Sequence, residues 1–208
     1  MKPSVVIQRN LVDNIESLVL ARHKMLFLSG PRQCGKTTLV KSLLFNKAHY
    51  FNWDDVSFKK RWTKDIDSLA EQVLQDVRPR IVLDEIHKNP KWKNQVKAFY
   101  DKYGDKIEII LTGSAHLNVY RRGADSLLGR FIHFHLHPLS YGELSSKSCM
   151  SFSEFNNFVG GFSKNQSVYS KSSASENNKV KLLFEFGGFP EPYLAHDKKV
   201  HQIWIKNR

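Results

Sequence analysis

The stretch GPRQCGKT at residues 30–37 places the strictest demand on the fold, because it matches the spacing Gly-x-x-x-x-Gly-Lys-Ser/Thr. Such a motif works where a buried strand ends in a tight turn and a helix begins directly after it. The backbone N–H groups of the turn and of the helix N-terminus then point at one place. The apolar run KMLFLSG precedes the motif and KTTLVKSLL follows it. The sequence therefore predicts a strand, a phosphate-binding loop and a helix, in that order.

Two side chains at the end of the loop predict contacts with a nucleotide and its metal ion. Lys36 is expected to reach the β- and γ-phosphates, and the Thr37 hydroxyl is expected to bind Mg²⁺. Cys34 is expected to be a spectator. The predicted nucleotide-binding residues are Gly30, Pro31, Arg32, Gln33, Cys34, Gly35, Lys36, Thr37 and Thr38.

Apolar segments of strand length recur after the loop and alternate with helical patterns. HYFNWDD, RIVLDE and KIEIILTGS are the expected strands, and DSLAEQVLQD and NPKWKNQVKAFYDKYG are the expected helices between them. Pro90 stands near the start of the second helix and Gly104 lies beyond its end. Strands that are nearly all apolar, separated by helices, indicate a parallel sheet with both faces covered.

Two acids end the strand RIVLDE. Asp84 is expected to hold Mg²⁺, and Glu85 is expected to orient and deprotonate a water that attacks the γ-phosphate. A helix start is the alternative explanation for two adjacent acids. A small-molecule kinase must exclude water and a Ras-like switch takes a glutamine from elsewhere, so this glutamate favours hydrolysis.

The strand KIEIILTGS ends on hydroxyl residues. Thr112 and Ser114 are expected to lie between the acid pair and the γ-phosphate and to sense hydrolysis. A plain strand-ending turn at Thr-Gly-Ser is the competing interpretation, and the sensor role gains weight only because the other two motifs precede it.

Composition excludes some classes and leaves one open. The chain has no long apolar run of membrane-spanning length and no signal-peptide pattern, so a cytoplasmic protein is expected. Cys34 and Cys149 make no disulfide or metal framework. The formal net charge is +12, and the densest basic cluster, His87 to Lys97, includes Trp92. A nucleic-acid surface competes there with a solvated basic helix face, which we favour.

Four segments taken together resemble a family of prokaryotic AAA-type P-loop ATPases. They are LSGPRQCGKTTL, IVLDEIHKNPKWKNQVKAFYD, ILTGSAHLNVYRRGADSLLGRFIHFHLHPLSYGEL and FGGFPEPYL. The likeness runs from Gln8 to Leu194, with the Ser-rich tract outside it. Family members usually carry a second, C-terminal domain of unknown function, and this chain looks truncated before it.

The resemblance implies a fold and one further site residue. The implied fold is α/β, a P-loop NTPase three-layer sandwich with a five-stranded parallel sheet. The strand before Thr112 would lie between the loop strand and the Asp84 strand. The resemblance also implies a nucleotide-facing arginine, here Arg130, from the same chain or from a neighbour in an assembly. Arg121 and Arg122 compete for this role, and a plain surface position is the alternative for Arg130.

The second half of the chain has a different pattern. Residues 1–140 are expected to form the ATPase core, 141–162 a helical extension, 163–179 a flexible Ser/Asn/Lys-rich linker and 180–208 the start of a truncated region. Ser140 and Glu143 are placed as a capping box for a helix beginning at SYGEL. His133, His135 and His137 alternate as metal ligands would, but no Cys or acid joins them closely, so we expect partly exposed strand histidines.

The sequence therefore predicts an ATP-binding, Mg²⁺-dependent ATPase of the AAA type, with catalytic Lys36, Glu85 and Arg130. The alternative is a nucleotide-dependent switch or DNA-associated module with little or no turnover. A homo-oligomer or a protein partner is compatible with both. A small-molecule kinase is disfavoured, because no acceptor-binding lid is recognisable. ATP is preferred over GTP, since no guanine-reading Asn-Lys-x-Asp motif is present.

Overall fold

The structure is a computed structural model, and it describes residues 7–113, 127–145 and 174–207. The chain divides into two compact units, which are described separately. The first unit is Leu11–His137, and the second combines Met1–Asn10 with Pro138–Arg208. The sequence predicts a core of residues 1–140, whereas in the structure Met1–Asn10 and residues 138–140 belong to the second unit.

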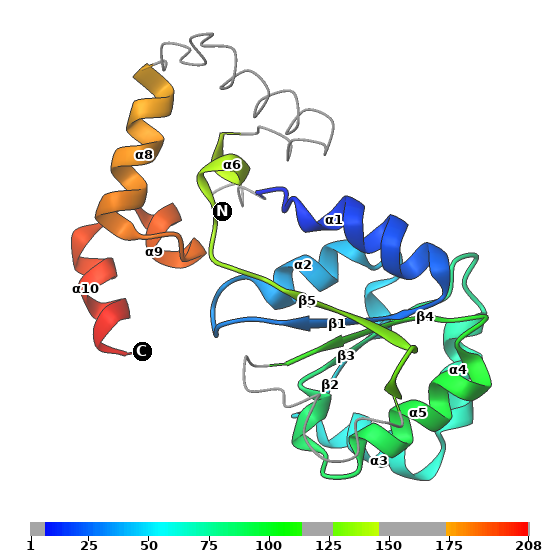
Figure 1. The fold of residues 1–208 in the computed structure, drawn as a ribbon. Coiled ribbons are helices and arrows are strands. Elements are labelled where there is room, and N and C mark those ends of the chain that lie inside the picture. The colour runs from blue at the N-terminus through cyan, green and yellow to red at the C-terminus, as the bar shows by residue number, and fades with distance from the viewer. Residues whose placement is uncertain (1–6, 114–126, 146–173, 208) are drawn as a thin grey trace, which may run out of the picture. The chain divides into compact units, whose positions relative to one another are not determined.

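The first unit is an α/β sandwich built on a five-stranded sheet (Figure 1). The strand order is β2-β3-β4-β1-β5, and every neighbouring pair is parallel. The strands are β1 Met25–Ser29, β2 Tyr50–Asn52, β3 Arg80–Asp84, β4 Glu108–Thr112 and β5 Phe131–His135. The five-stranded parallel P-loop fold is confirmed, as is the insertion of β4 between the loop strand and the Asp84 strand.

Helices cover both faces of this sheet. On one face lie α1 and α2, and on the other lie α3, α4 and α5 (Figure 1). The helices of this unit are α1 Leu11–Asn14, α2 Lys36–Leu43, α3 Val56–Lys64, α4 Ile66–Leu74 and α5 Trp92–Tyr103. Short helical turns follow α1 at Ile15–Val19 and Leu20–Arg22, and others occupy Lys47–His49 and η4, Ile86–Lys88. The helix predicted around Trp92 is confirmed, and Gly104 follows it directly.

β1 and β3 are largely apolar because both of their faces are buried. All five residues of β1 and of β3 are buried. Since side chains alternate along a strand, Met25 and Phe27 join the core with α3, α4 and α5, while Leu26 and Leu28 are directed to the opposite face. Trp92 of α5 belongs to this core and is 7% exposed.

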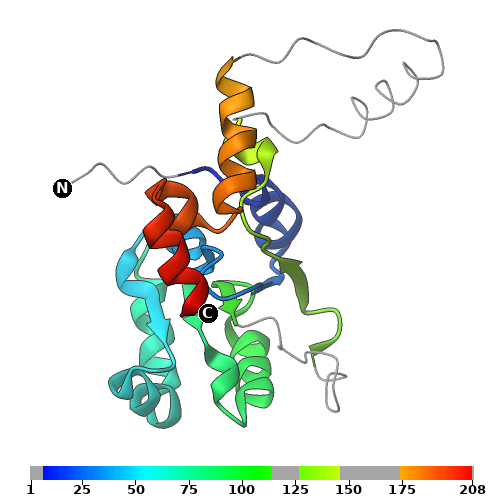
Figure 2. The same cartoon turned by 90° about the vertical axis from the view of Figure 1, so that its left-hand side faces the viewer.

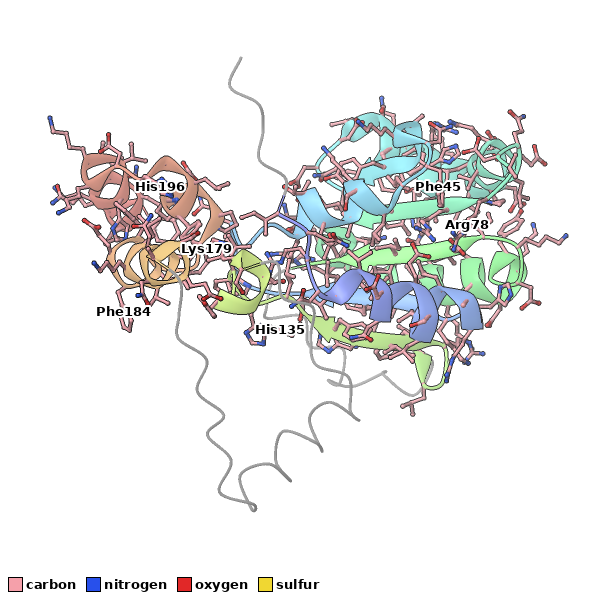
Figure 3. The ribbon with its side chains drawn as sticks, turned by 90° about the horizontal axis from the view of Figure 1, so that it is seen from above. Phe45, Arg78, His135, Lys179, Phe184 and His196 are labelled. Atoms are coloured by element: carbon pink, nitrogen blue, oxygen red, sulfur yellow. The ribbon has the colours of Figure 1, made fainter. Side chains whose placement is uncertain are left out.

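An ion-pair network lies at the edge of the sheet where β3 and β4 begin. The buried guanidinium of Arg80 forms two parallel bonds with Glu16, at 2.8 and 2.9 Å, and a third bond with Glu108 at 2.6 Å. Arg78 contacts the same two carboxylates. The ring centre of Phe45 lies 5.1 Å from the guanidinium carbon of Arg78 and 5.0 Å from that of Arg80 (Figure 3). This network links Glu16, which lies just after α1, to the sheet.

The second unit contains four described helices: α6 Tyr141–Leu144, α8 Ala174–Phe186, α9 Pro190–Ala195 and α10 Lys198–Lys206 (Figure 2). The capping box predicted for Ser140 and Glu143 is present. Glu143 also accepts a bond from Arg9 Nε at 2.8 Å, and both side chains are 8% exposed. Phe189, the residue just before α9, packs against Trp204 of α10, with their ring centres 4.9 Å apart.

The start of α8 corrects part of the predicted linker 163–179. Residues 174–179 are helical, whereas 163–173 and residues 146–162 of the expected helical extension lie outside the described residues. Leu182 and Leu183 of α8 pack against Leu139, Leu144 and Tyr193. Packing of the C-terminal half nucleates the helix, which then extends into the polar residues at small additional cost.

Within the described ranges, no helix combines the length and the apolar character that crossing a bilayer requires.

Candidate functional site

The loop between β1 and α2 has the backbone geometry that its glycines predict. Gly30 has a φ of +155°, and a Cβ atom on it would lie 2.4 Å from the carbonyl oxygen of Leu136. The backbone at Leu136 is held in place, because Leu136 N donates a hydrogen bond to Ser29 O at 2.8 Å. Gly35 has a φ of +99° just before α2. The loop therefore needs glycine at residue 30 for space and at residue 35 for conformation.

Lys36, the first residue of α2, curls back over the loop. Its Nζ donates to the carbonyl oxygens of Gly30 at 2.9 Å and of Pro31 at 2.7 Å. The side chain is 8% exposed. The loop carbonyls thus hold the ammonium group of the residue that opens α2, and the N-terminus of a helix favours phosphate oxygens.

Asp84, at the end of β3, is the point where four elements meet. Its carboxylate is 4% exposed. Thr37 Oγ1 of α2 lies 3.4 Å from Oδ2, Thr112 Oγ1 of β4 donates to Oδ1, and the Tyr50 hydroxyl of β2 donates to Oδ2. The carboxyl ends of parallel strands meet at one edge of a sheet, which explains the convergence. The structure thus brings Thr37, Asp84 and Thr112 together beside the loop.

Tyr50 was missed by the sequence reasoning. Burial, followed by the hydrogen bond to Asp84 and the charge of Asp84, raises the pKa of Tyr50 well above its ordinary value. The phenol therefore stays protonated and donates a hydrogen bond to the carboxylate. Lys41 Nζ lies 4.2 Å from the centre of its ring. A tyrosine in a predicted strand carries no signal of its own, because only the pairing of β2 with β3 directs it to Asp84.

Glu85 follows Asp84 but leaves the strand. Its backbone is left-handed, with φ +56° and ψ +23°, and it opens the η4 turn through a bond from Lys88 N to its carbonyl at 3.0 Å. A left-handed backbone is uncommon for a glutamate and is found disproportionately at functional sites. The Glu85 carboxylate is 27% exposed, and its Oε2 lies 3.5 Å from His87 Nε2.

The remaining predicted residues divide into two groups. Ser114, Arg121 and Arg122 lie outside the described residues. Arg130 lies at the far end of β1 from the loop, because its carbonyl accepts from Met25 N, the first residue of that strand. A strand of this length spans about 15 Å at ~3.3 Å per residue. Arg130 Nε instead contacts Asp101 Oδ1 at 2.7 Å. The structure therefore does not bring Arg130 to the loop within one chain, and contact from a neighbouring copy stays a prediction.

The strand histidines gather around a serine. Ser29 Oγ lies 2.7 Å from His133 Nε2 and 3.0 Å from His135 Nδ1. Burial lowers the pKa of both histidines, so their neutral forms are favoured. In the part of the chain that the structure describes, no three His, Cys, Asp or Glu side chains form a group that could hold a metal ion.

The basic cluster His87 to Lys97 exposes fewer of its groups than the sequence alone suggests, because Trp92 is buried. Trp92 packs into the core, with its ring centre 5.5 Å from that of Phe27, so it is not available to stack on a base. Lys88 Nζ lies 2.6 Å from Asp54 Oδ2. A nucleic-acid surface on this helix would have to rely on the remaining lysines.

Comparisons with known proteins agree with this geometry. A family model described as an AAA domain matches residues 22–145, which is more than half of the chain. No curated protein sequence matches this chain.

Two solved structures share the fold at low identity. One is a STAND protein (signal transduction ATPase with numerous domains) with a tetratricopeptide repeat sensor from Pyrococcus horikoshii. It is 17% identical, with a TM-score of 0.53, and the match covers 90% of this chain and 29% of that one. The other is the Aeropyrum pernix ORC1 protein in complex with DNA, 14% identical with a TM-score of 0.52. That match covers 99% of this chain and 62% of that one.

This chain thus spans less than two thirds of the length of either protein. The matched residues include the loop and both acids of the Asp84–Glu85 pair. The chain therefore belongs to the AAA domain family of nucleotide-binding P-loop ATPases.

Proposed function

We propose that this chain binds Mg²⁺-ATP at residues 30–38 and hydrolyses it to ADP and phosphate. The observation that carries the proposal is the convergence on Asp84. A buried carboxylate at the end of β3 faces the loop hydroxyl of Thr37, and a strand-end threonine from β4 joins them. This arrangement supports the proposal, because groups suited to phosphate and a carboxylate suited to a metal ion lie side by side.

The oxygen atoms at this point suit magnesium. Mg²⁺ prefers hard oxygen ligands and usually takes one or two protein oxygens together with water and substrate phosphates. Thr37 Oγ1 and Asp84 Oδ2, 3.4 Å apart, would provide such a pair. When bound, the ion would neutralise charge on the β- and γ-phosphate oxygens.

The protein side chains have separate roles in the proposed reaction. Lys36 exchanges the carbonyl oxygens of Gly30 and Pro31 for phosphate oxygens of the nucleotide. Glu85, partly exposed and adjacent to Asp84, accepts a proton from the attacking water. Thr112 keeps the Asp84 carboxylate oriented through its hydroxyl. Arg130 of a neighbouring copy would complete the site in an assembly.

The test is steady-state ATP hydrolysis by the purified protein, with and without Mg²⁺. Glu85→Gln keeps the shape of the side chain and removes the base. We expect turnover to fall by about 100-fold or more while ATP binding is retained. Lys36→Ala is the matched variant that should lose binding. Tight ATP binding by the wild type without any turnover would overturn the proposal and favour a nucleotide-dependent switch.

A further inference from the structure

We propose that His87 is a positioning residue for Glu85: its Nε2–H holds one carboxylate oxygen so that the other can accept the proton of the attacking water. This inference rests on the proposed hydrolysis. It assigns a role to a side chain that lies in the IVLDEIHK segment but for which the sequence predicted no role, and it starts from the 3.5 Å contact between His87 Nε2 and Glu85 Oε2.

The backbone of the η4 turn holds Glu85 and His87 close to each other. Glu85 adopts its left-handed conformation at the end of β3, and the η4 turn follows at once. Ile86, between the two side chains in sequence, is 0% exposed and packs into the hydrophobic core. Asn89 N closes the turn on Ile86 O at 3.0 Å. The buried isoleucine fixes the turn, and the turn presents Glu85 and His87 to each other.

The chemistry of the pair determines which ring nitrogen carries hydrogen. An ionised carboxylate only accepts hydrogen bonds, so the nitrogen that faces it must be the donor. His87 Nδ1 is buried and has no hydrogen-bond partner among the described residues, which suits a bare lone pair better than a second N–H. Burial lowers the pKa of His87, although the charge of Glu85 opposes that shift. The ring is therefore a neutral single donor.

A single neutral donor suits a general base. It orients one carboxylate oxygen but does not neutralise the negative charge of the carboxylate, whereas a cation would neutralise it and weaken the base. The nearest competing cation on the same turn, Lys88, has its Nζ 2.8 and 2.6 Å from the two carboxylate oxygens of Asp54. The 3.5 Å separation between His87 Nε2 and Glu85 Oε2 is longer than the roughly 2.7–3.2 Å of an N–H···O hydrogen bond. In this proposal the distance shortens when substrate binds, as catalytic contacts that are long in ligand-free structures often do.

Two amide substitutions separate positioning from mere packing. In His87→Gln an amide N–H can reach the place of Nε2, whereas in His87→Asn the side chain is one methylene shorter and cannot. Both variants keep a polar, uncharged group, and His87→Ala removes it. We expect Asn and Ala to lower kcat by about 10-fold with KM for ATP unchanged, and Gln to retain kcat within about 3-fold. In a Glu85→Gln background, His87→Ala should cause no further loss.

The outcomes are distinguishable. Wild-type kcat in both His87→Ala and His87→Asn would overturn the positioning role while leaving the proposed hydrolysis intact. A rise in KM or a loss of ATP binding at constant kcat would overturn it as well, since it would indicate a structural contribution to the nucleotide site. A wild type without turnover would remove the proposed function and this inference together. Thermal unfolding of each variant identifies any that fail to fold.

Discussion

The hydroxyl of Tyr50 donates to Oδ2 of Asp84, the same oxygen that lies 3.4 Å from Thr37 Oγ1. Asp84 is nearly inaccessible to water, so its lone pairs are directed by these hydroxyl groups and not by solvent. A carboxylate held in this way has a fixed orientation before any metal arrives, which is what a metal ligand requires.

Removing the Tyr50 hydroxyl should therefore weaken Mg²⁺ binding. In Tyr50→Phe we expect the Mg²⁺ concentration for half-maximal ATP binding or hydrolysis to rise by about 10-fold, because partners of metal ligands commonly contribute 10–100-fold to affinity. Tyr103→Phe is the matched control, since its hydroxyl also bonds an aspartate, Asp67, but at the surface. Equal Mg²⁺ dependence in both variants would contradict the prediction.

The glycine at residue 30 should be indispensable for folding of the loop. Gly30→Ala places a Cβ atom 2.4 Å from a backbone oxygen and adds a backbone conformation that L-residues avoid. We expect a loss of about 2–4 kcal/mol in the free energy of unfolding, measured by urea denaturation.

Gly129→Ala is the control for backbone conformation alone. Gly129 also has a positive φ, +75°, but nothing lies within 4 Å of the added Cβ. Its expected loss is about 1 kcal/mol. Similar losses in the two variants would show that the close approach of Leu136 O is unimportant.

Replacement of Arg130 should leave the isolated chain nearly unchanged. Arg130 and Asp101 are 31% and 43% exposed, and a pair of this kind contributes up to about 1 kcal/mol. We expect Arg130→Ala to bind ATP as the wild type does in dilute solution, in contrast to Lys36→Ala. Calorimetric titration with ATP measures both. A large loss of affinity in Arg130→Ala at low protein concentration would show that this arginine reaches the nucleotide of its own chain.

Acid should weaken the network around Arg80. Burial raises the pKa of Glu16, but the hydrogen bonds and charges of Arg80 and Arg78 outweigh that effect and lower the pKa below the ordinary glutamate value. A carboxylate whose pKa is lowered by folding contributes stability that is fully present above its unfolded pKa. That stability is lost as pH falls through the folded pKa.

We therefore expect Glu16→Gln to be less stable than the wild type at neutral pH and this difference to shrink progressively below about pH 4.5. Chemical denaturation across that pH range measures it. Glu71→Gln, on the exposed face of α4, supplies the control for removing a carboxylate. A difference that stays constant with pH would mean that the charge of Glu16 is not what Arg80 requires.

The sequence was sufficient wherever chemistry depends on neighbours along the chain. The glycines and Lys36 of the loop, the apolar strands before it and before Asp84, and the Ser140–Glu143 capping box are local patterns, and their elements are where the patterns place them. The place of the Thr112 strand between the loop strand and the Asp84 strand was implied by the family resemblance, and the structure confirms it. The pattern misled at residues 174–179, because packing of Leu182 and Leu183 stabilises a helix that begins in a polar segment.

Tertiary structure decided what meets across strands. Tyr50 reaches Asp84 because β2 pairs with β3, and Thr112 reaches it because β4 is inserted beside β3. Arg130 lies at the opposite end of β1 because β5 runs parallel to that strand and Arg130 precedes its first residue. The sequence alone predicted a phosphate-binding loop and two acids suited to hydrolysis. Which hydroxyl groups contact Asp84 depended on strand pairing, since contacts between distant residues are set by the register of the sheet and not by spacing along the chain.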